Sequence, residues 1–145
     1  MQMKGELKLK TIEQGLLFEA RVGDQRFFLD SGPGVVAPSP VQVVLSALGG
    51  CTGMDIISIL RKKRQQVTGY EILLEADRSD EHPKVLKRVT IVHRFHGHDL
   101  SPAACEEAIR LSATRYCSVH AMLHHNVEIE SRFEIVPAEA PARPA

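Results

Sequence analysis

Apolar and polar positions alternate over the first thirty residues, with the period of strands that bury one face. The clearest stretch is Glu6-Leu7-Lys8-Leu9-Lys10, and Gly23-Asp24 separates two further stretches of the same kind. This alternation predicts a three-stranded meander. Glycines and prolines at 31–34 and 37–40 then favour a loop.

From residue 41 the apolar positions change to helical spacing, at 41, 44, 45, 48, 56, 59 and 60. Ser39-Pro40 supplies an N-cap followed by proline at the first helical position, and the basic run 61–64 suits the other end of the helix. We predict a long central helix here. Gly49 and Gly50 each cost about 1 kcal/mol inside a helix relative to alanine, and we interpret them as leaving backbone open beside Cys51.

This helix is apolar enough to raise the question of a membrane span. Gln42, Ser46, Asp55 and Ser58 interrupt it, and an aspartate alone costs about 2.5–3.5 kcal/mol at the bilayer centre. We therefore expect a buried helix and no membrane partner. A helix that is apolar all round needs more cover than one small chain readily supplies, which favours a homodimer.

The remaining elements follow from the same kinds of pattern. Residues 67–77 and 85–97 favour a second hairpin, and Ser101-Pro102 opens a helix that we expect to reach about Tyr116. A short helix at 119–123 and a final strand at 127–136 follow. The fold class is therefore α+β, in a single domain over 1–136. We expect the tail 137–145 to be disordered because it contains only Pro, Ala, Glu and Arg.

The composition argues against several classes of function. The 145 residues include 18 basic and 18 acidic side chains, so the formal charge is zero and we expect no nucleic-acid partner. Three cysteines and an N-terminus without an apolar stretch favour the cytoplasm.

Of the seven histidines, His120 and His124 are spaced to share a helix face. Because no third ligand stands at a recognisable spacing, we predict no bound metal and no cofactor.

Two of the three cysteines carry the candidate chemistry, although a free cysteine is most often an inert, buried hydrophobe. Cys51 follows two glycines and has Asp55 one turn further along the predicted helix. Cys117 stands at a helix end beside Arg115, a setting in which a thiolate can be stabilised. We interpret Cys105, which lies among alanines and glutamates, as structural packing.

The motifs around these cysteines resemble those of the OsmC/Ohr family, the osmotically inducible and organic hydroperoxide resistance proteins. Residues 37–51, APSPVQVVLSALGGC, are similar to its central-helix signature, and residues 111–119, LSATRYCSV, are similar to its second-cysteine motif. Within the family, the residues of these two motifs are most similar to those of a YhfA-like branch. The resemblance implies an OsmC-like α+β fold, an intertwined homodimer and thiol sites between the subunits.

The resemblance also implies a thiol-dependent peroxidase that reduces organic or lipid hydroperoxides in oxidative-stress defence. Cys51 would be the peroxidatic cysteine and Cys117 the resolving cysteine, and a dithiol or other thiol reductant would reopen their disulfide. Family peroxidases carry a glutamate after the proline that opens the central helix, whereas this chain has Val41 there, and Gln42 cannot supply a carboxylate.

The remaining candidates have less specific signals. Arg21 and Arg26 are the only arginines before the central helix, and either is a candidate for activating Cys51. Arg115 could take this activating role instead, or it could merely cap the C-terminal end of its helix. The candidate substrate-binding residues are Gly50, Asp55 and Gln42. Two other functions stay open: a dimeric binding protein for a small lipophilic ligand, with idle or redox-sensing thiols, and an interaction module with structural cysteines.

Overall fold

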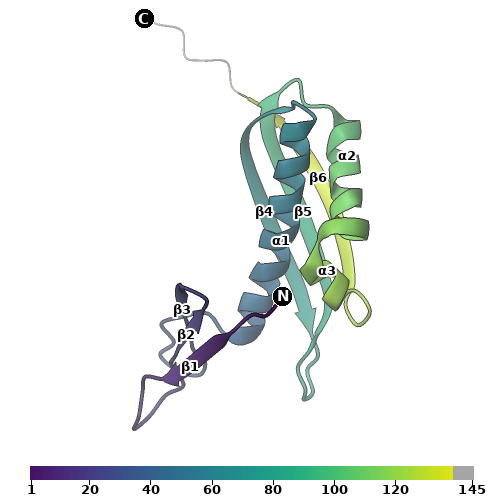
Figure 1. Ribbon diagram of the computed structural model, residues 1–145. Helices are drawn as coiled ribbons and strands as arrows, with labels where there is room; N and C mark the ends of the chain where they lie inside the picture. Colours follow the sequence, from purple (N-terminus) through teal and green to yellow (C-terminus); the bar gives the residue numbers. More distant parts are fainter. Residues whose placement is uncertain (139–145) are drawn as a thin grey trace, which may run out of the picture. The chain divides into compact units, whose positions relative to one another are not determined.

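A computed structural model describes residues 1–138. The chain forms two compact units that divide between Val44 and Leu45. Its strands and helices are largely segregated along the sequence, which confirms the expected α+β class (Figure 1). A single domain over 1–136 stays a prediction.

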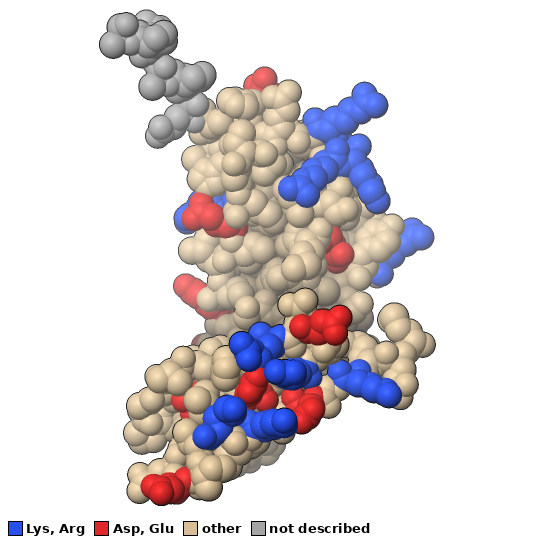
Figure 2. Space-filling view, turned by 60° about the vertical axis from the view of Figure 1, so that its left-hand side comes forward, with Lys and Arg blue, Asp and Glu red and all other residues tan. Residues whose placement is uncertain are grey.

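The first unit contains the predicted meander. Strands β1 (Gly5–Leu9), β2 (Phe18–Val22) and β3 (Gln25–Leu29) form an antiparallel sheet in sequence order. Gly23 has a φ of 58°, as the first residue of a tight two-residue hairpin requires. Figure 2 shows basic and acidic side chains interleaved over this unit, and Glu19 pairs with Lys10, Arg21 and Arg26.

Helix α1 (Pro40–Lys62) begins where the sequence predicts. The Ser39 hydroxyl accepts from the Gln42 backbone N–H at 3.2 Å, and the Gln42 side-chain oxygen accepts from the Ser39 N–H at 2.9 Å. These reciprocal bonds form a capping box, which satisfies two N–H groups at the start of the helix. The Gln42 side chain therefore has a structural role that the sequence analysis did not assign to it.

The second unit is built on a sheet of β4 (Gln66–Arg78), β5 (Leu86–His98) and β6 (Glu128–Pro137). β4 and β5 pair antiparallel, whereas β5 and β6 pair parallel. The parallel pairing follows from the helical crossover between β5 and β6. Helices α1 and α2 (Pro102–Leu111) both lie over one face of this sheet (Figure 1). Every second residue of β5 from Val89 to Gly97 is buried, as strand geometry dictates.

The core of the second unit lies between these helices and the sheet. Its buried members include Ile56 and Leu60 from α1, Phe95 from β5 and Cys105 from α2. Cys105 is fully buried, which confirms its structural interpretation. His93 is also fully buried on the same face of β5.

The helix after Ser101 reaches Tyr116 as predicted, but its last turn is not α-helical. Ser101 caps α2 as expected, but the α-helix ends at Leu111 and one π-helical turn, η1 (Ser112–Tyr116), follows. The Cys117 N–H donates to the Ser112 carbonyl at 2.8 Å, a bond that spans five residues instead of four. Such a turn accommodates one extra residue and often marks a functional segment. A short helix, α3 (Ser118–Leu123), continues the chain.

The C-terminal boundary also differs from the prediction. Pro137 is the last residue of β6 and pairs with Gly97, so it does not belong to a tail. The expected disorder of the rest of that segment falls mainly on 139–145, which lie outside the described residues.

Helix α1 is long and apolar enough, by length and composition alone, to cross a membrane. A core helix of a soluble protein meets the same criterion, and Leu48, Ile56 and Leu60 are fully buried within the chain.

The helical glycines divide into two kinds. A Cβ on Gly49 would lie 2.8 Å from the Leu74 side chain, and one on Gly53 would collide with Ile72. These two glycines, four residues apart on one face of α1, let the helix approach β4 closely. Only Gly50 faces open space. The expectation that both Gly49 and Gly50 leave backbone open is therefore correct for Gly50 and wrong for Gly49.

We expect Gly53→Ala to lower the free energy of unfolding by about 1–2 kcal/mol, because the overpacking against Ile72 outweighs the gain in helix propensity. Gly50→Ala is the matched control on the same helix. It should raise the free energy of unfolding by about 0.5–1 kcal/mol. Urea denaturation of both variants checks this, and equal effects at the two positions would contradict the proposed packing.

Candidate functional site

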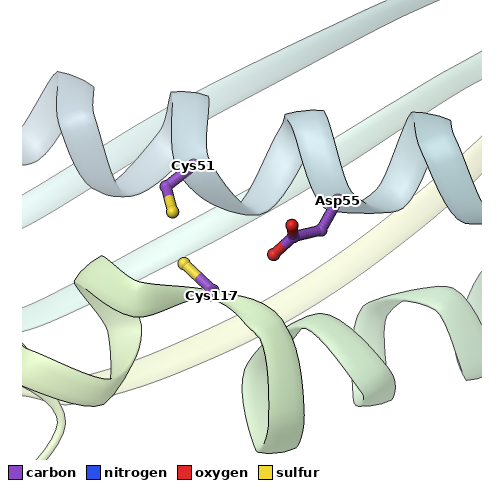
Figure 3. Close-up of side chains that lie close together, drawn as sticks. All are labelled: Cys51, Asp55 and Cys117. Carbon is purple, nitrogen blue, oxygen red and sulfur yellow. The ribbon is translucent and has the colours of Figure 1, made fainter. Parts of the chain in front are cut away.

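Cys51 and Cys117 lie close together in the second unit. Cys51 is in the middle of α1, and Cys117 lies between η1 and α3. Their sulfurs and one carboxylate oxygen of Asp55 all lie within 4.8 Å of one another. Figure 3 shows the three side chains pointing into the space between α1 and the segment around Cys117. Both cysteines carry free thiols in this structure.

The two elements position the thiols differently. Asp55 follows Cys51 by four residues, so both side chains lie on one face of α1. Cys117 has extended backbone geometry and caps α3, where its sulfur accepts the His120 N–H at 3.3 Å. Because its backbone is extended, Cys117 ends η1 and begins α3, and so lies at the junction of two helices.

The environment of Cys117 favours a neutral thiol. Burial, its proximity to Cys51 and the nearby charge of Asp55 raise the pKa of Cys117 to about 11, although the His120 N–H acts in the opposite direction. Cys117 is only 3% exposed, whereas Cys51 is half-buried. A reagent that reaches the site therefore meets Cys51 more readily.

Asp55 belongs to a small polar network that joins α1 to the η1 turn. The Ser112 hydroxyl donates to the Asp55 carboxylate at 3.1 Å, and it lies 2.8 Å from the Thr52 hydroxyl. Thr52 and Ser112 are both buried. In residues 1–138 no lysine or arginine forms a salt bridge with Asp55. Ser112 was not predicted as a site residue, although it stands within the second-cysteine motif.

Asp55 also lines a cavity of about 370 Å³. The walls contain apolar side chains, with two lysines at the C-terminal part of α1. The other lining residues are Ser58, Ile59, Lys62, Lys63, Leu111 and Tyr116. This cavity gives solutes a route to the Asp55 carboxylate.

The candidate arginines are divided between the two units, with Arg115 in the unit that holds the sulfurs. Arg115 is exposed, and its guanidinium lies 5.5 Å from the centre of the Tyr116 ring. Arg21 and Arg26 are opposite each other on β2 and β3 of the first unit, where both contact Glu19. Gln42 is engaged in the capping box. Of the predicted residues, the structure brings together Cys51, Cys117 and Asp55, with Gly50 adjoining Cys51 in α1.

The histidines do not form the metal-ligand group that their spacing suggested as a possibility. The rings of His120 and His124 stack at 5.5 Å, and those of His124 and His125 lie 4.0 Å apart. Burial, followed by the charge of His124, lowers the pKa of His120. Among the described residues, the one group of three or more metal-ligating donor atoms within such close range is Cys51, Asp55 and Cys117.

Comparisons with known proteins agree with this fold. The family model described as OsmC-like protein matches residues 31–132. Protein YhfA of Escherichia coli strain K12 is 39% identical over 135 residues, which cover 92% of this chain and 99% of that relative. A crystal structure of a hypothetical protein from Aquifex aeolicus VF5 is 27% identical, with a TM-score of 0.85, and covers 96% of this chain and 99% of that one.

Hydroperoxide resistance proteins share the fold at lower identity. The crystal structure of the organic hydroperoxide resistance protein OhrB of Bacillus subtilis is 13% identical, with a TM-score of 0.63, over 92% of this chain and 98% of that one. The family model spans most of the chain, and the YhfA match extends over nearly all of it. Both matches extend over residues 37–51 and 111–119 of this chain, which contain Cys51 and Cys117. The chain therefore belongs to the OsmC-like family.

Proposed function

We propose that this protein is a thiol-dependent peroxidase that reduces organic or lipid hydroperoxides and so contributes to oxidative-stress defence. The observation that carries the proposal is the approach of the Cys51 and Cys117 sulfurs to within 4.8 Å. A disulfide requires about 2.05 Å between the sulfurs, so side-chain rotation and a small backbone shift bring the pair to bonding distance. The fold shared with hydroperoxide resistance proteins supports the same reaction class.

The proposed chemistry has three steps. The Cys51 thiolate attacks the outer peroxide oxygen of R–O–OH, the O–O bond breaks, and the alkoxide takes a proton to leave as the alcohol. Cys51 is then a sulfenic acid. The Cys117 sulfur attacks it, and the disulfide forms with release of water. An external dithiol finally reduces the disulfide and becomes oxidised itself.

The environments of the two thiols support these roles. Cys51 is more accessible than Cys117, and it directly follows Gly50, which faces open space in α1. Cys117 is held as a neutral thiol because its pKa is raised to about 11. A neutral thiol next to the nucleophile is a poor competitor for peroxide, and it can donate a proton to the departing alkoxide.

Activation of Cys51 differs from the pattern expected of family peroxidases. The Asp55 carboxylate near the sulfurs is one of the groups that raise the pKa of Cys117. Arg115 remains our candidate stabilising cation within the second unit, and Arg21 or Arg26 remains the candidate from the first unit. Substrate contacts are proposed for Gly50 and Asp55, which adjoin Cys51 and the cavity. The capping role of Gln42 weakens its candidacy.

We further propose that the active form is a cytoplasmic homodimer. The meander of the first unit exposes large apolar side chains, including Leu7, Phe27 and Phe28, and Met54 is 73% exposed on α1. Apolar side chains at this density on a small chain favour association with a second copy. The reductant is a thiol or dithiol of small enough size to reach a half-buried sulfur.

The direct test is a stoichiometric oxidation. Reduced protein mixed with one equivalent of cumene hydroperoxide should lose two free thiols per chain, form cumyl alcohol and lose two hydrogens in mass. Peptide mapping should place the disulfide between Cys51 and Cys117, with Cys105 unmodified because it is fully buried. Survival of both thiols in a large excess of peroxide would show that the protein is not a peroxidase.

One observation favours a second candidate, a binding protein for a small lipophilic ligand. The first unit contains a cavity of about 310 Å³, lined mainly by apolar side chains of Leu7, Leu16, Phe18, Leu29 and Pro40. This volume suits a small apolar molecule. Saturable binding of such a ligand by protein that leaves peroxide intact would favour this candidate over the peroxidase.

A further inference from the structure

Three metal-ligating side chains converge at the thiol site from two segments of the chain. Cys51 and Asp55 come from consecutive turns of α1, and Cys117 comes from the junction of η1 and α3. Every pair of their donor atoms lies within 4.8 Å. Thiolate sulfur and carboxylate oxygen are both zinc ligands, and a tetrahedral zinc ion with bonds of about 2.3 Å holds two sulfurs about 3.8 Å apart. Adjustments of about one ångström therefore convert the observed arrangement into a coordination shell.

Outer contacts already orient two of these three groups. The Ser112 hydroxyl donates to one Asp55 oxygen, and Ser112 is held in turn by Thr52. The backbone N–H of His120 donates to the Cys117 sulfur. Hydrogen bonds of this kind fix ligand orientation in metal sites. They come from buried residues or backbone, so the ligands are oriented before any ion arrives.

The charges at the site also favour a cation. Two thiolates and a carboxylate would bring three negative charges together. No lysine or arginine in residues 1–138 forms an ion pair with Asp55. A bound divalent ion relieves the mutual repulsion that otherwise keeps such groups protonated. The cavity that Asp55 lines provides an entry route on the carboxylate side of the group.

We propose that the reduced Cys51–Cys117 pair and Asp55 bind one zinc ion, with water in the fourth position. Binding replaces the two thiol protons: Zn²⁺ and two S–H groups give a dithiolate complex and two released protons. The site needs only reduced thiols, so it is independent of whether the protein reduces peroxides. A bound ion occupies both sulfurs and thus prevents their disulfide, which makes zinc an inhibitor of the proposed redox cycle.

The test uses reduced full-length protein, freed of metal with a chelator and kept without oxygen. Zn²⁺ should bind at one ion per chain, with a Kd on the order of 1 µM or tighter, and should release close to two protons. Co²⁺ is the spectroscopic probe. It should give the intense visible bands of a tetrahedral site and a near-ultraviolet charge-transfer band from thiolate sulfur.

Matched variants localise the site. Cys51→Ser and Cys117→Ser should each abolish the charge-transfer band or weaken it by about half, and should weaken zinc binding at least about a hundredfold. Asp55→Asn should weaken binding about tenfold or more while keeping the band. The controls are Cys105→Ala and Asp80→Asn, whose side chains lie in the core and on the exposed surface, and both should bind zinc unchanged. Circular dichroism verifies that each variant is folded.

Several outcomes overturn the proposal. They are a pale octahedral Co²⁺ spectrum, zinc binding that survives Cys51→Ser, or equal binding by the oxidised, disulfide-bonded protein. The last two would place the ion elsewhere, for instance at His120 and His124. Zinc binding by protein that never consumes peroxide would leave this inference standing and remove the proposed enzymatic function. Peroxide turnover without zinc binding would do the reverse.

Discussion

Cys51→Ser should reduce peroxide consumption by at least about a thousandfold, because serine cannot supply a thiolate and no other accessible thiol replaces it. Cys117 is buried and its pKa is raised to about 11, and Cys105 is fully buried in the core. The measurement is the rate of cumene hydroperoxide loss with a dithiol as reductant. The substitution is nearly isosteric, so the fold should persist, and Tm checks this.

Cys117→Ser is the informative partner variant. It keeps the nucleophile but lacks the thiol that closes the disulfide, so the first equivalent of peroxide should be consumed at near the normal rate. The sulfenic acid on Cys51 should then be over-oxidised, and mass spectrometry should show two or three added oxygens instead of a disulfide. If Cys117→Ser lost the first step and Cys51→Ser kept it, the two roles would be reversed.

Acidification should destabilise the protein through His93. This side chain is fully buried, its Nδ1 lies 2.6 Å from the Tyr70 hydroxyl, and its Nε2 has no hydrogen-bond partner among residues 1–138. Burial lowers its pKa from 6.5 to about 4, because a charged ring is disfavoured in the core. The unfolded chain therefore takes up the proton more readily than the folded chain.

The direction of the effect follows from this difference. Above pH 6.5 the ring is neutral in both states and its contribution to stability is complete, and this contribution is lost as pH falls towards 4. The free energy of unfolding should fall by about 2 kcal/mol between pH 7.5 and pH 5, and by about 3 kcal/mol once the ring is charged in both states. Urea denaturation at a series of pH values measures it.

His93→Gln separates this contribution from the titration of carboxylates. The variant should be less stable than the parent at neutral pH, because Tyr70 loses its partner and the core is disturbed. Its stability should nevertheless change with pH by about 2 kcal/mol less over the same interval. His98→Gln, at the exposed end of the same strand, is the control and should keep the full dependence. An unchanged slope in His93→Gln would assign the acid sensitivity to other groups.

Much of the fold could be predicted from local patterns. Strand alternation, the Ser-Pro helix starts and the change to helical spacing are properties of short segments, and α1 and the hairpins follow them closely. The π turn could not be predicted in this way. It depends on which backbone carbonyl accepts the Cys117 N–H, and that carbonyl belongs to Ser112. The Ser112 side chain is held in place by contacts with Thr52 and Asp55, about sixty residues earlier in the chain. Such contacts leave no periodic signal.

The two cysteines of the site were predicted from the sequence, but the residues around them were predicted less well. The motifs identified Cys51 and Cys117, but the interpretation of Gly49 required knowing that Leu74 packs against it. Histidines at regular spacing were the metal ligands that the sequence suggested. The donor group of Cys51, Asp55 and Cys117 combines a helical pair with a distant residue, so sequence spacing could not reveal it.

The single π turn makes the pairing of the two thiols tolerant of a one-residue deletion. Cys117 bonds the carbonyl of Ser112 five residues earlier, so the turn holds one residue more than a regular α-helical turn. If one residue between Ser112 and Cys117 were removed, the cysteine would reach the same carbonyl through a regular four-residue bond. Relatives that are one residue shorter in this stretch should therefore keep the thiol pair.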